Sequence, residues 1–176
     1  MEPEQLVAAV RPGVRLRRLP SAPDEVVLAG GGEVFRLPLT GPAVVASAAA
    51  VRALPHLRAL VPVRVPVPRF VGVLADGATP FTAERRLAGV PGLPATSTAL
   101  GQLAGLLEAL AAVPEREAAS WGVPGSGRLL HGALSASTLL ADPARGVLTG
   151  VVGWRPRLGD PAEDLAGLDP EVRGRL

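Results

Sequence analysis

The stretch from Leu129 to Leu168 decides the fold of this chain, and it reads LLHGALSASTLLADPARGVLTGVVGWRPRLGDPAEDLAGL. Two short apolar runs, 139–141 and 147–152, are separated by the turn residues Asp142-Pro143, a pattern typical of a β-hairpin. A His-Gly pair precedes the hairpin, and the run 159–161 (Gly-Asp-Pro) follows it and opens a short helix. The stretch therefore predicts a loop, a hairpin and a helix N-terminus, in that order.

This order resembles the catalytic core of the aminoglycoside phosphotransferase family, small-molecule kinases with a protein-kinase-like fold. There the stretch reads roughly HGDLHPGN, an apolar strand, a turn, a second apolar strand ending in Asp-Trp, and then GDPAxDLA. The residues that shape this core are present here: His131, Gly132, Leu134, Trp154, Gly159, Asp160, Pro161, Ala162, Asp164 and Leu165. The resemblance implies a short member of the family, because family members normally continue with several more helices.

The residues that carry the chemistry of the family are replaced. Ala133 stands at the position of the catalytic Asp, Thr138 at that of a metal-binding Asn, and Gly153 at that of the metal-binding Asp. Alanine and glycine offer no side-chain oxygen, and one neutral hydroxyl is a poor magnesium ligand. Losing a general base alone costs about 10²–10⁴ in rate. We therefore expect a catalytically degenerate member with no intact catalytic residue and no bound Mg²⁺.

Three polar residues of the stretch survive, and we interpret them as scaffold. In kinase-like folds the His at the place of His131 is mostly packed and hydrogen-bonded. Asp160 could approach the cleft, but its place before the last helix favours capping of free N–H groups. Asp164 lies one turn later. Together with Gly132 and Trp154, these residues are predicted to shape the core rather than to react.

The first half of the chain predicts an antiparallel sheet with one helix. Alternating or apolar runs predict strands at residues 14–19, 25–29, 33–39, 70–74 and 81–87. Gly30-Gly31-Gly32 predicts a hairpin turn; a phosphate-cradling loop is the alternative, but it lacks the P-loop Lys and the helix that should follow. An alanine-rich helix is predicted over 43–54, ended by Pro55, and an Asp76-Gly77 turn joins the last two strands.

Arg36 and Glu84 are the candidate nucleotide-binding residues. In the family a basic residue of the third strand holds the phosphates, and Arg36 occupies that place; an arginine on a solvent-facing strand surface is the alternative. Ser47 stands where the family's helix carries the Glu that pairs with this residue, so we expect Arg36 to lack its orienting partner. Residues 84–92 resemble the hinge between the lobes, where backbone groups would meet the base of ATP or GTP.

The sequence thus predicts an α+β, protein-kinase-like two-lobe fold. Residues 1–92 form an N-terminal lobe with hinge, of about five antiparallel strands plus one helix. Residues 93–176 form a truncated, mostly helical C-terminal lobe with the short catalytic-loop hairpin. Its clearest helix spans 96–113, where Leu100, Leu103, Leu107 and Leu110 keep helical spacing. Trp121 is predicted to be a packed anchor.

Composition excludes several classes of function. The 176 residues carry a net charge of +2 and no cysteine, which leaves no disulfide, thiolate metal site or cysteine nucleophile. Arg15, Arg17 and Arg18 are not interleaved with aromatic residues, so binding of nucleic acid is not expected. The first residues, MEPEQL, lack the features of a signal peptide, and no apolar run predicts a membrane span. We expect a cytoplasmic protein.

Four functions remain open at this point. The first is a pseudokinase that binds a partner protein or ligand, or associates with itself, because a reduced C-terminal lobe should leave apolar surface to cover. The second is an active ATP- or GTP-dependent phosphotransferase, with rearranged catalytic residues, acting on a hydroxyl of a small molecule. The third is a nucleotide or small-molecule sensor, and the fourth is a remnant without activity. We favour the first.

Overall fold

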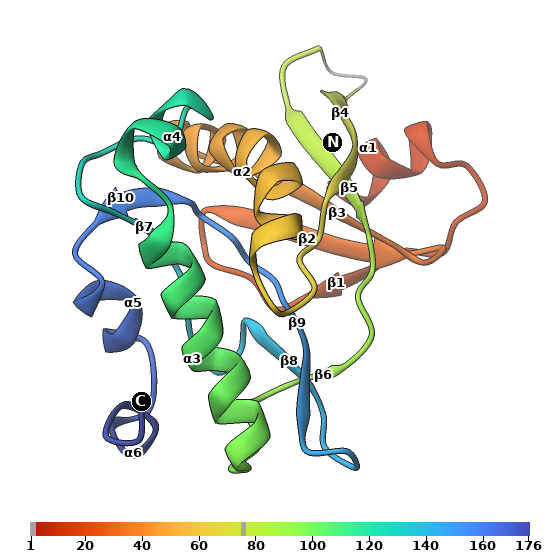
Figure 1. The fold of residues 1–176 in the computed structure, drawn as a ribbon. Helices are drawn as coiled ribbons and strands as arrows, with labels where there is room; N and C mark the ends of the chain where they lie inside the picture. The colour runs from red at the N-terminus through yellow and green to blue at the C-terminus, as the bar shows by residue number, and fades with distance from the viewer. Residues whose placement is uncertain (1–2, 75–76) are drawn as a thin grey trace.

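A five-stranded antiparallel sheet forms the first half of the chain in this computed structural model, which describes residues 3–74 and 77–176. The strands lie in the order β1-β2-β3-β5-β4, so that β1 and β4 are the two edges (Figure 1). Their bounds are Arg17–Leu19 (β1), Glu25–Gly30 (β2), Glu33–Pro38 (β3), Pro68–Val73 (β4) and Pro80–Arg85 (β5). The predicted α+β class and the sheet of about five strands are confirmed, although β1 is shorter than the predicted strand.

The triple glycine is the turn of the β2–β3 hairpin, as predicted. Gly30 pairs with Glu33 at the end of the ladder, and Gly31 and Gly32 have φ values of 58° and 78°. Two successive residues in this left-handed region form the turn that suits the twist of a two-residue hairpin, and glycine adopts it without strain. Of the turn predicted between β4 and β5, Asp76 lies outside the described residues.

Two helices, α1 (Pro3–Val10) and α2 (Gly41–Leu60), accompany the sheet. Thr40 caps α2, because its hydroxyl accepts a hydrogen bond from the Ala43 N–H at 3.3 Å. The prediction that Pro55 ends this helix is wrong: Pro55 lies inside it. An internal proline removes one helical hydrogen bond, and the helix nevertheless continues because Leu57, one turn after Ala53, is fully buried.

The second half of the chain holds two small sheets and four helices. The strands β6, β8 and β9 form a three-stranded sheet, and β7 pairs with β10. The bounds are Val90–Pro91 (β6), Ser97–Ala112 (α3), Glu115–Ser120 (α4), Arg128–Leu130 (β7), Leu139–Asp142 (β8), Val147–Val151 (β9), Arg157–Gly159 (β10), Ala162–Ala166 (α5) and Pro170–Arg173 (α6). The catalytic-loop hairpin, β8–β9, is where the sequence predicts it, whereas β6, β7 and β10 were not predicted.

One large core joins α2 to the second half of the chain. Leu54 and Leu57 of α2 belong to the same buried cluster as Leu103 and Leu110 of α3. Trp121 is buried in it and stacks on the ring of His56 with centroids 4.7 Å apart, which confirms the predicted anchor. Although α2 is long and apolar enough to cross a membrane by length and composition, its buried face is part of this folded core.

Candidate functional site

The three positions that replace the family's chemical residues lie together, at the start and end of the β8–β9 hairpin. The Thr138 hydroxyl lies 3.0 Å from the Ser135 carbonyl and 3.3 Å from the Ala133 carbonyl, and it accepts a hydrogen bond from the Ser135 N–H. A Cβ added to Gly153 would lie 2.9 Å from the Thr138 methyl carbon, and Gly153 has a φ of 74°. The three positions therefore lie close together in space, and the Thr138 hydroxyl is hydrogen-bonded to the backbone of its own loop.

These residues do not fit a magnesium ion. Neither Ala133 nor Gly153 has a side-chain oxygen, and the Thr138 hydroxyl is occupied by backbone groups. Mg²⁺ takes near-octahedral oxygen ligands and is usually bound through one or two carboxylates. In the part of the chain that the structure describes, no three His, Cys, Asp or Glu side chains are grouped so as to hold a metal.

His131 and Asp164 hold the shape of this loop from behind. The buried Asp164 carboxylate, from α5, accepts hydrogen bonds from the His131 N–H at 2.7 Å and the Gly132 N–H at 2.9 Å. The His131 ring accepts from the Ala133 N–H through Nδ1, so Nε2 carries the proton and donates to the Val152 carbonyl at 3.1 Å. The Trp154 ring packs 4.4 Å from it. His131 is therefore buried, packed against Trp154 and hydrogen-bonded to the backbone.

Burial keeps the His131 imidazole neutral. The ring is fully buried, and the loss of hydration lowers its pKa to about 3, although the hydrogen bond to the Val152 carbonyl acts in the other direction. Gly132, with a φ of 81°, has no alternative here, since a Cβ on it would overlap the Arg155 carbonyl. The loop is therefore built from residues that its geometry requires, none of which is a general base at neutral pH.

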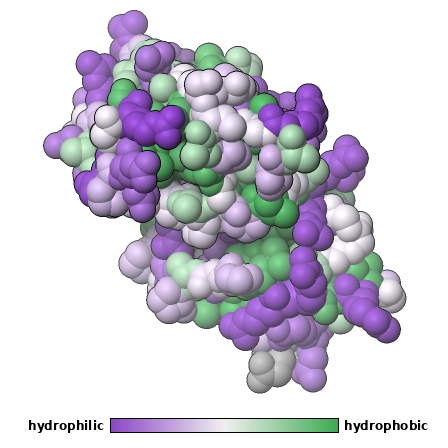
Figure 2. All heavy atoms as spheres, turned by 90° about the horizontal axis from the view of Figure 1, so that it is seen from below, coloured by the Kyte–Doolittle hydropathy of each residue, from purple (hydrophilic) through white to green (hydrophobic). Residues whose placement is uncertain are grey.

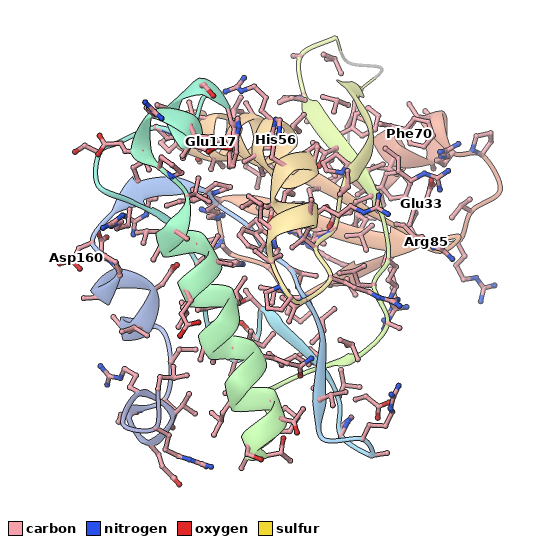
Figure 3. All side chains as sticks on the ribbon, viewed as in Figure 1. Glu33, His56, Phe70, Arg85, Glu117 and Asp160 are labelled. Carbon is pink, nitrogen blue, oxygen red and sulfur yellow. The ribbon has the colours of Figure 1, made fainter. Side chains whose placement is uncertain are left out.

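Asp160 caps the turn before α5, as the sequence predicts. Its carboxylate accepts a hydrogen bond from the Ala162 N–H at 2.9 Å, and the Glu163 carboxylate accepts one from the Asp160 N–H at 3.1 Å. This reciprocal arrangement satisfies N–H groups that a helix start leaves free. Asp160 is exposed and lies on the side of the molecule away from the five-stranded sheet (Figure 3).

The expectation that Arg36 lacks a partner is wrong. Its Nε lies 3.1 Å from Oε1 of Glu84, and its Nη1 lies 3.1 Å from Oε2 of Glu25. No acid is present in α2, where Ser47 lines a cavity beside Arg36. The carboxylates come instead from the two strands next to β3. Because Val27 and Thr82 are the residues opposite Arg36, Glu25 and Glu84 are its diagonal neighbours on the same face of the sheet.

The β2–β3 register shows that Glu25 could have been predicted from the sequence as a partner of Arg36. The glycine turn sets the pairing of β2 with β3, and that pairing places Glu25 diagonal to Arg36. Glu84, which falls in both the predicted strand 81–87 and the predicted hinge 84–92, lies within β5 with its side chain 4% exposed. Finding it required the order of β3 and β5 in the sheet, which follows from the tertiary fold.

The Arg36 guanidinium stays protonated despite its burial. Burial acts to lower the pKa of Arg36, but the carboxylates of Glu84 and Glu25 outweigh it and raise that pKa above its ordinary value. Burial raises the pKa of Glu84, and the guanidinium of Arg36 opposes this shift. An arginine stays protonated in proteins, so both carboxylates keep a cation beside them. The guanidinium is thereby occupied within the protein.

A second ion pair, which the sequence did not suggest, involves Arg155, another residue of the same cavity wall. Arg155 follows Trp154 and donates two hydrogen bonds to the Asp24 carboxylate, at 2.8 and 2.5 Å. Asp24 ends the loop between β1 and β2, so the pair joins the five-stranded sheet to the segment after β9. The hydrogen bond from Arg155 lowers the pKa of Asp24. Because the two residues are 131 positions apart in the sequence, no local pattern could have predicted this contact.

The space between these charges is small. A cavity of about 30 Å³ lies between β3, β5, α2 and the Trp154–Arg155 segment, with Arg36, Glu25 and Glu84 in its wall. Sites for small molecules measure about 300–1,000 Å³, and one water needs about 10–15 Å³. Three apolar side chains on the Arg36 face of the sheet are also buried: Val27, Ala29 and Val34. They have little surface to offer an adenine or guanine ring.

The fold is that of solved aminoglycoside and macrolide phosphotransferases. The structure of the GDP and kanamycin complex of APH(2")-IIia superposes with a TM-score of 0.83 at 20% identity, covering 97% of this chain and 80% of that one. Macrolide 2'-phosphotransferase MphH from Brachybacterium faecium gives a TM-score of 0.73 at 22% identity, covering 97% and 79%. A thermostable mutant of aminoglycoside phosphotransferase APH(4)-Ia gives 0.67 at 16% identity, covering 93% and 75%.

Sequence comparisons add nothing to this likeness. No family model matches the chain, and no curated protein matches it either. At these identities the likeness concerns the fold, and it extends over nearly the whole chain. The protein therefore has the kinase-like fold of the aminoglycoside and macrolide phosphotransferases.

Proposed function

We propose that this protein is a pseudokinase: a kinase-like phosphotransferase fold that does not transfer phosphate and acts by binding a partner protein or a ligand. The observation that carries the proposal is the cluster of five charges in the cleft. Arg36 pairs with Glu25 and Glu84, and Arg155 pairs with Asp24. By its resemblance to the family, Arg36 takes the position of the basic residue that holds phosphates. The two guanidinium groups that could meet an anion are already bound by carboxylates.

The charge of this cluster also disfavours a nucleotide. Three carboxylates and two guanidinium groups leave a net charge of −1. A nucleoside triphosphate is strongly negative, and kinases neutralise it with Mg²⁺ and a free basic residue. This site has no residues suited to hold the metal, within the described residues, and its basic groups are occupied. A triphosphate that bound these guanidinium groups would have to displace the carboxylates of Glu25, Glu84 and Asp24 from them.

An active phosphotransferase acting on a hydroxyl of a small molecule is the competing function. It is suggested by the names of the structural neighbours, which are aminoglycoside and macrolide phosphotransferases. It would need a base to accept the hydroxyl proton, and the site has Ala133 at the family's position for that base. His131 cannot replace it, because both ring nitrogens are engaged by the backbone. The geometry therefore favours the pseudokinase.

The test is thermal unfolding with ATP and with GTP, each with and without Mg²⁺. A ligand present at a hundred times its dissociation constant adds about 2.7 kcal/mol to stability, which a melting curve resolves easily. We expect no shift under any of the four conditions. A shift that requires Mg²⁺ would contradict the proposal and restore the enzyme, and a Mg²⁺-independent shift would indicate a nucleotide sensor.

A variant tests why nucleotides are expected to leave the melting temperature unchanged. Asp24→Ala frees the Arg155 guanidinium, so this variant should respond to ATP more than the native protein does. Glu108→Ala removes an exposed carboxylate from α3, far along the chain from the cleft, and is the matched control. If the two variants behave alike, the Asp24–Arg155 pair is not what keeps nucleotides out.

A further inference from the structure

The two edges of the five-stranded sheet differ in how they are protected. The edge strand β1 has three residues and exposes Arg17 and Arg18. Short strands and charged side chains are the usual means by which proteins keep a sheet edge from pairing. The opposite edge, β4, has six residues and exposes apolar side chains instead: Phe70 is 44% exposed, Val71 61% and Val73 54%. Only β1 carries the usual protection along its length.

The backbone of β4 has free groups at this edge. The Leu74 N–H donates to the Thr79 carbonyl at 2.9 Å, and Gly72 pairs with Phe81 in the same register. Gly72 and Leu74 therefore direct their N–H and C=O groups toward β5. Alternate residues of an antiparallel strand point the other way. Val71 and Val73 thus present their backbone groups outward, and among the described residues no hydrogen bond from outside the sheet reaches them.

The side chains of β4 suit a second strand of the same sequence. Val71 and Val73 project on one face, the face of Thr82, and Phe70 projects on the other, where the Arg11 guanidinium lies 4.6 Å from its ring centre. The only charge of the strand, Arg69, lies at the irregularity between Pro68 and Phe70, before the free segment. Phe70 marks this side of the molecule in Figure 3.

We propose that β4 pairs in antiparallel orientation with β4 of a second copy of this chain. With the two-fold axis at Gly72, Val71 of each copy lies opposite Val73 of the other, and these two pairs exchange backbone hydrogen bonds. The arginines do not face each other in this register, and the valines form cross-strand apolar pairs. The five-stranded sheets become one continuous sheet. Because the edge is self-complementary, a two-fold dimer satisfies it completely.

This inference stands apart from the proposed function, because it concerns the edge of the sheet and not the cleft. The pairing surface is small, so we expect a weak dimer that forms at high protein concentration. A nucleotide-binding result leaves it unaffected. Failure of the dimer test likewise says nothing about phosphate transfer, and the two proposals fail separately.

Single cysteines test the register, because the chain has none of its own. Opposite Cα atoms of a hydrogen-bonded pair lie about 5.5 Å apart, within the disulfide range of about 4.4–6.8 Å. A mixture of Val71→Cys protein with tagged Val73→Cys protein should therefore cross-link under mild oxidation. Either protein alone should cross-link poorly, because its two cysteines lie about 9 Å apart, displaced by two residues of about 3.4 Å. Absence of the mixed dimer, or equal cross-linking in all three samples, overturns the proposal.

Sedimentation velocity over a range of concentrations measures the dimer directly. Val71→Lys brings a charge into the pairing face and should raise the dimer dissociation constant at least tenfold. Val45→Lys, at a position 56% exposed on α2, is the matched control and should leave it unchanged. Both positions are exposed, so both variants should fold. A native protein that stays monomeric at the highest concentration, or equal effects of the two lysines, contradicts the inferred dimer.

Discussion

Two clusters of buried polar side chains lie near the catalytic-loop segment, and they differ in the groups to which they are hydrogen-bonded. Behind the loop, Asp164 meets the N–H groups of His131 and Gly132, and a neutral imidazole completes the network. In the cleft in front of it, Arg36 is held by carboxylates from neighbouring strands. The first cluster satisfies backbone groups that the fold cannot leave unpaired. In the second cluster the charged side chains of Arg36, Glu25 and Glu84 pair with one another.

This difference separates what the fold needs from what the reaction needs. The residues behind the loop hold its shape, and they match the family pattern that the sequence resembles. In front of the loop the chain has Ala133, Gly153 and an internal ion network. The geometry of the loop therefore depends on side chains other than those that face the cleft. The face of the molecule in Figure 2 shows several separate hydrophobic areas among hydrophilic residues.

The largest expected effect comes from removing the carboxylate behind the loop. Asp164→Ala leaves the N–H groups of His131 and Gly132 buried without an acceptor, at about 1–3 kcal/mol each. We expect the free energy of unfolding, measured by urea denaturation, to fall by about 3–5 kcal/mol. Asp160→Ala, which removes an exposed capping carboxylate four residues away, should cost only about 1 kcal/mol. Equal losses of unfolding free energy in the two variants would show that the contribution of Asp164 to stability does not depend on its burial.

A smaller loss should follow in the cleft. Arg36→Met leaves Glu84, with its side chain 4% exposed, without a cation, and we expect a loss of about 3 kcal/mol. The double variant Arg36→Met with Glu84→Gln should recover part of that loss, since the buried charge is then gone. Arg11→Met breaks the more exposed pair with Glu33 and should cost about 1 kcal/mol or less. Denaturation of the native protein, Arg36→Met, Glu84→Gln and the double variant measures the coupling; its absence would mean that Arg36 and Glu84 do not stabilise one another.

The smallest effect is a pH dependence that the His131 ring confers. Its pKa is lowered to about 3 in the folded protein, against an ordinary value of about 6.5 in the unfolded chain. Between these values the unfolded state binds the proton and the folded state does not. Stability is therefore full above pH 6.5 and falls as the pH decreases, by up to about 1.4 kcal/mol per unit. Denaturation at pH 7, 6 and 5 should show this slope in the native protein and a shallower one in His131→Gln. An unchanged slope in the variant would assign the effect to other groups.

Much of the fold could be predicted from local pattern. The triple glycine, the β8–β9 hairpin and the helix α3 follow from turn residues and apolar spacing, which act over a few residues. The prediction failed at Pro55, where a helix signal was overridden by burial of the following turn. It also missed β6, β7 and β10, which are two or three residues long. Strands this short have no periodicity of their own, and they form because a partner strand is already in place.

The sequence by itself determined which side chains occupy the site. Ala133, Thr138 and Gly153 carry no carboxylate in any conformation, so the absence of a carboxylate at these three positions was settled before the chain folded. Only the tertiary structure decided what Arg36 and Arg155 do. Their partners lie 48 and 131 residues away along the chain, and an ion pair depends on the distance between charges in space, not on separation in sequence. Strand order and lobe packing placed those carboxylates beside the two arginines.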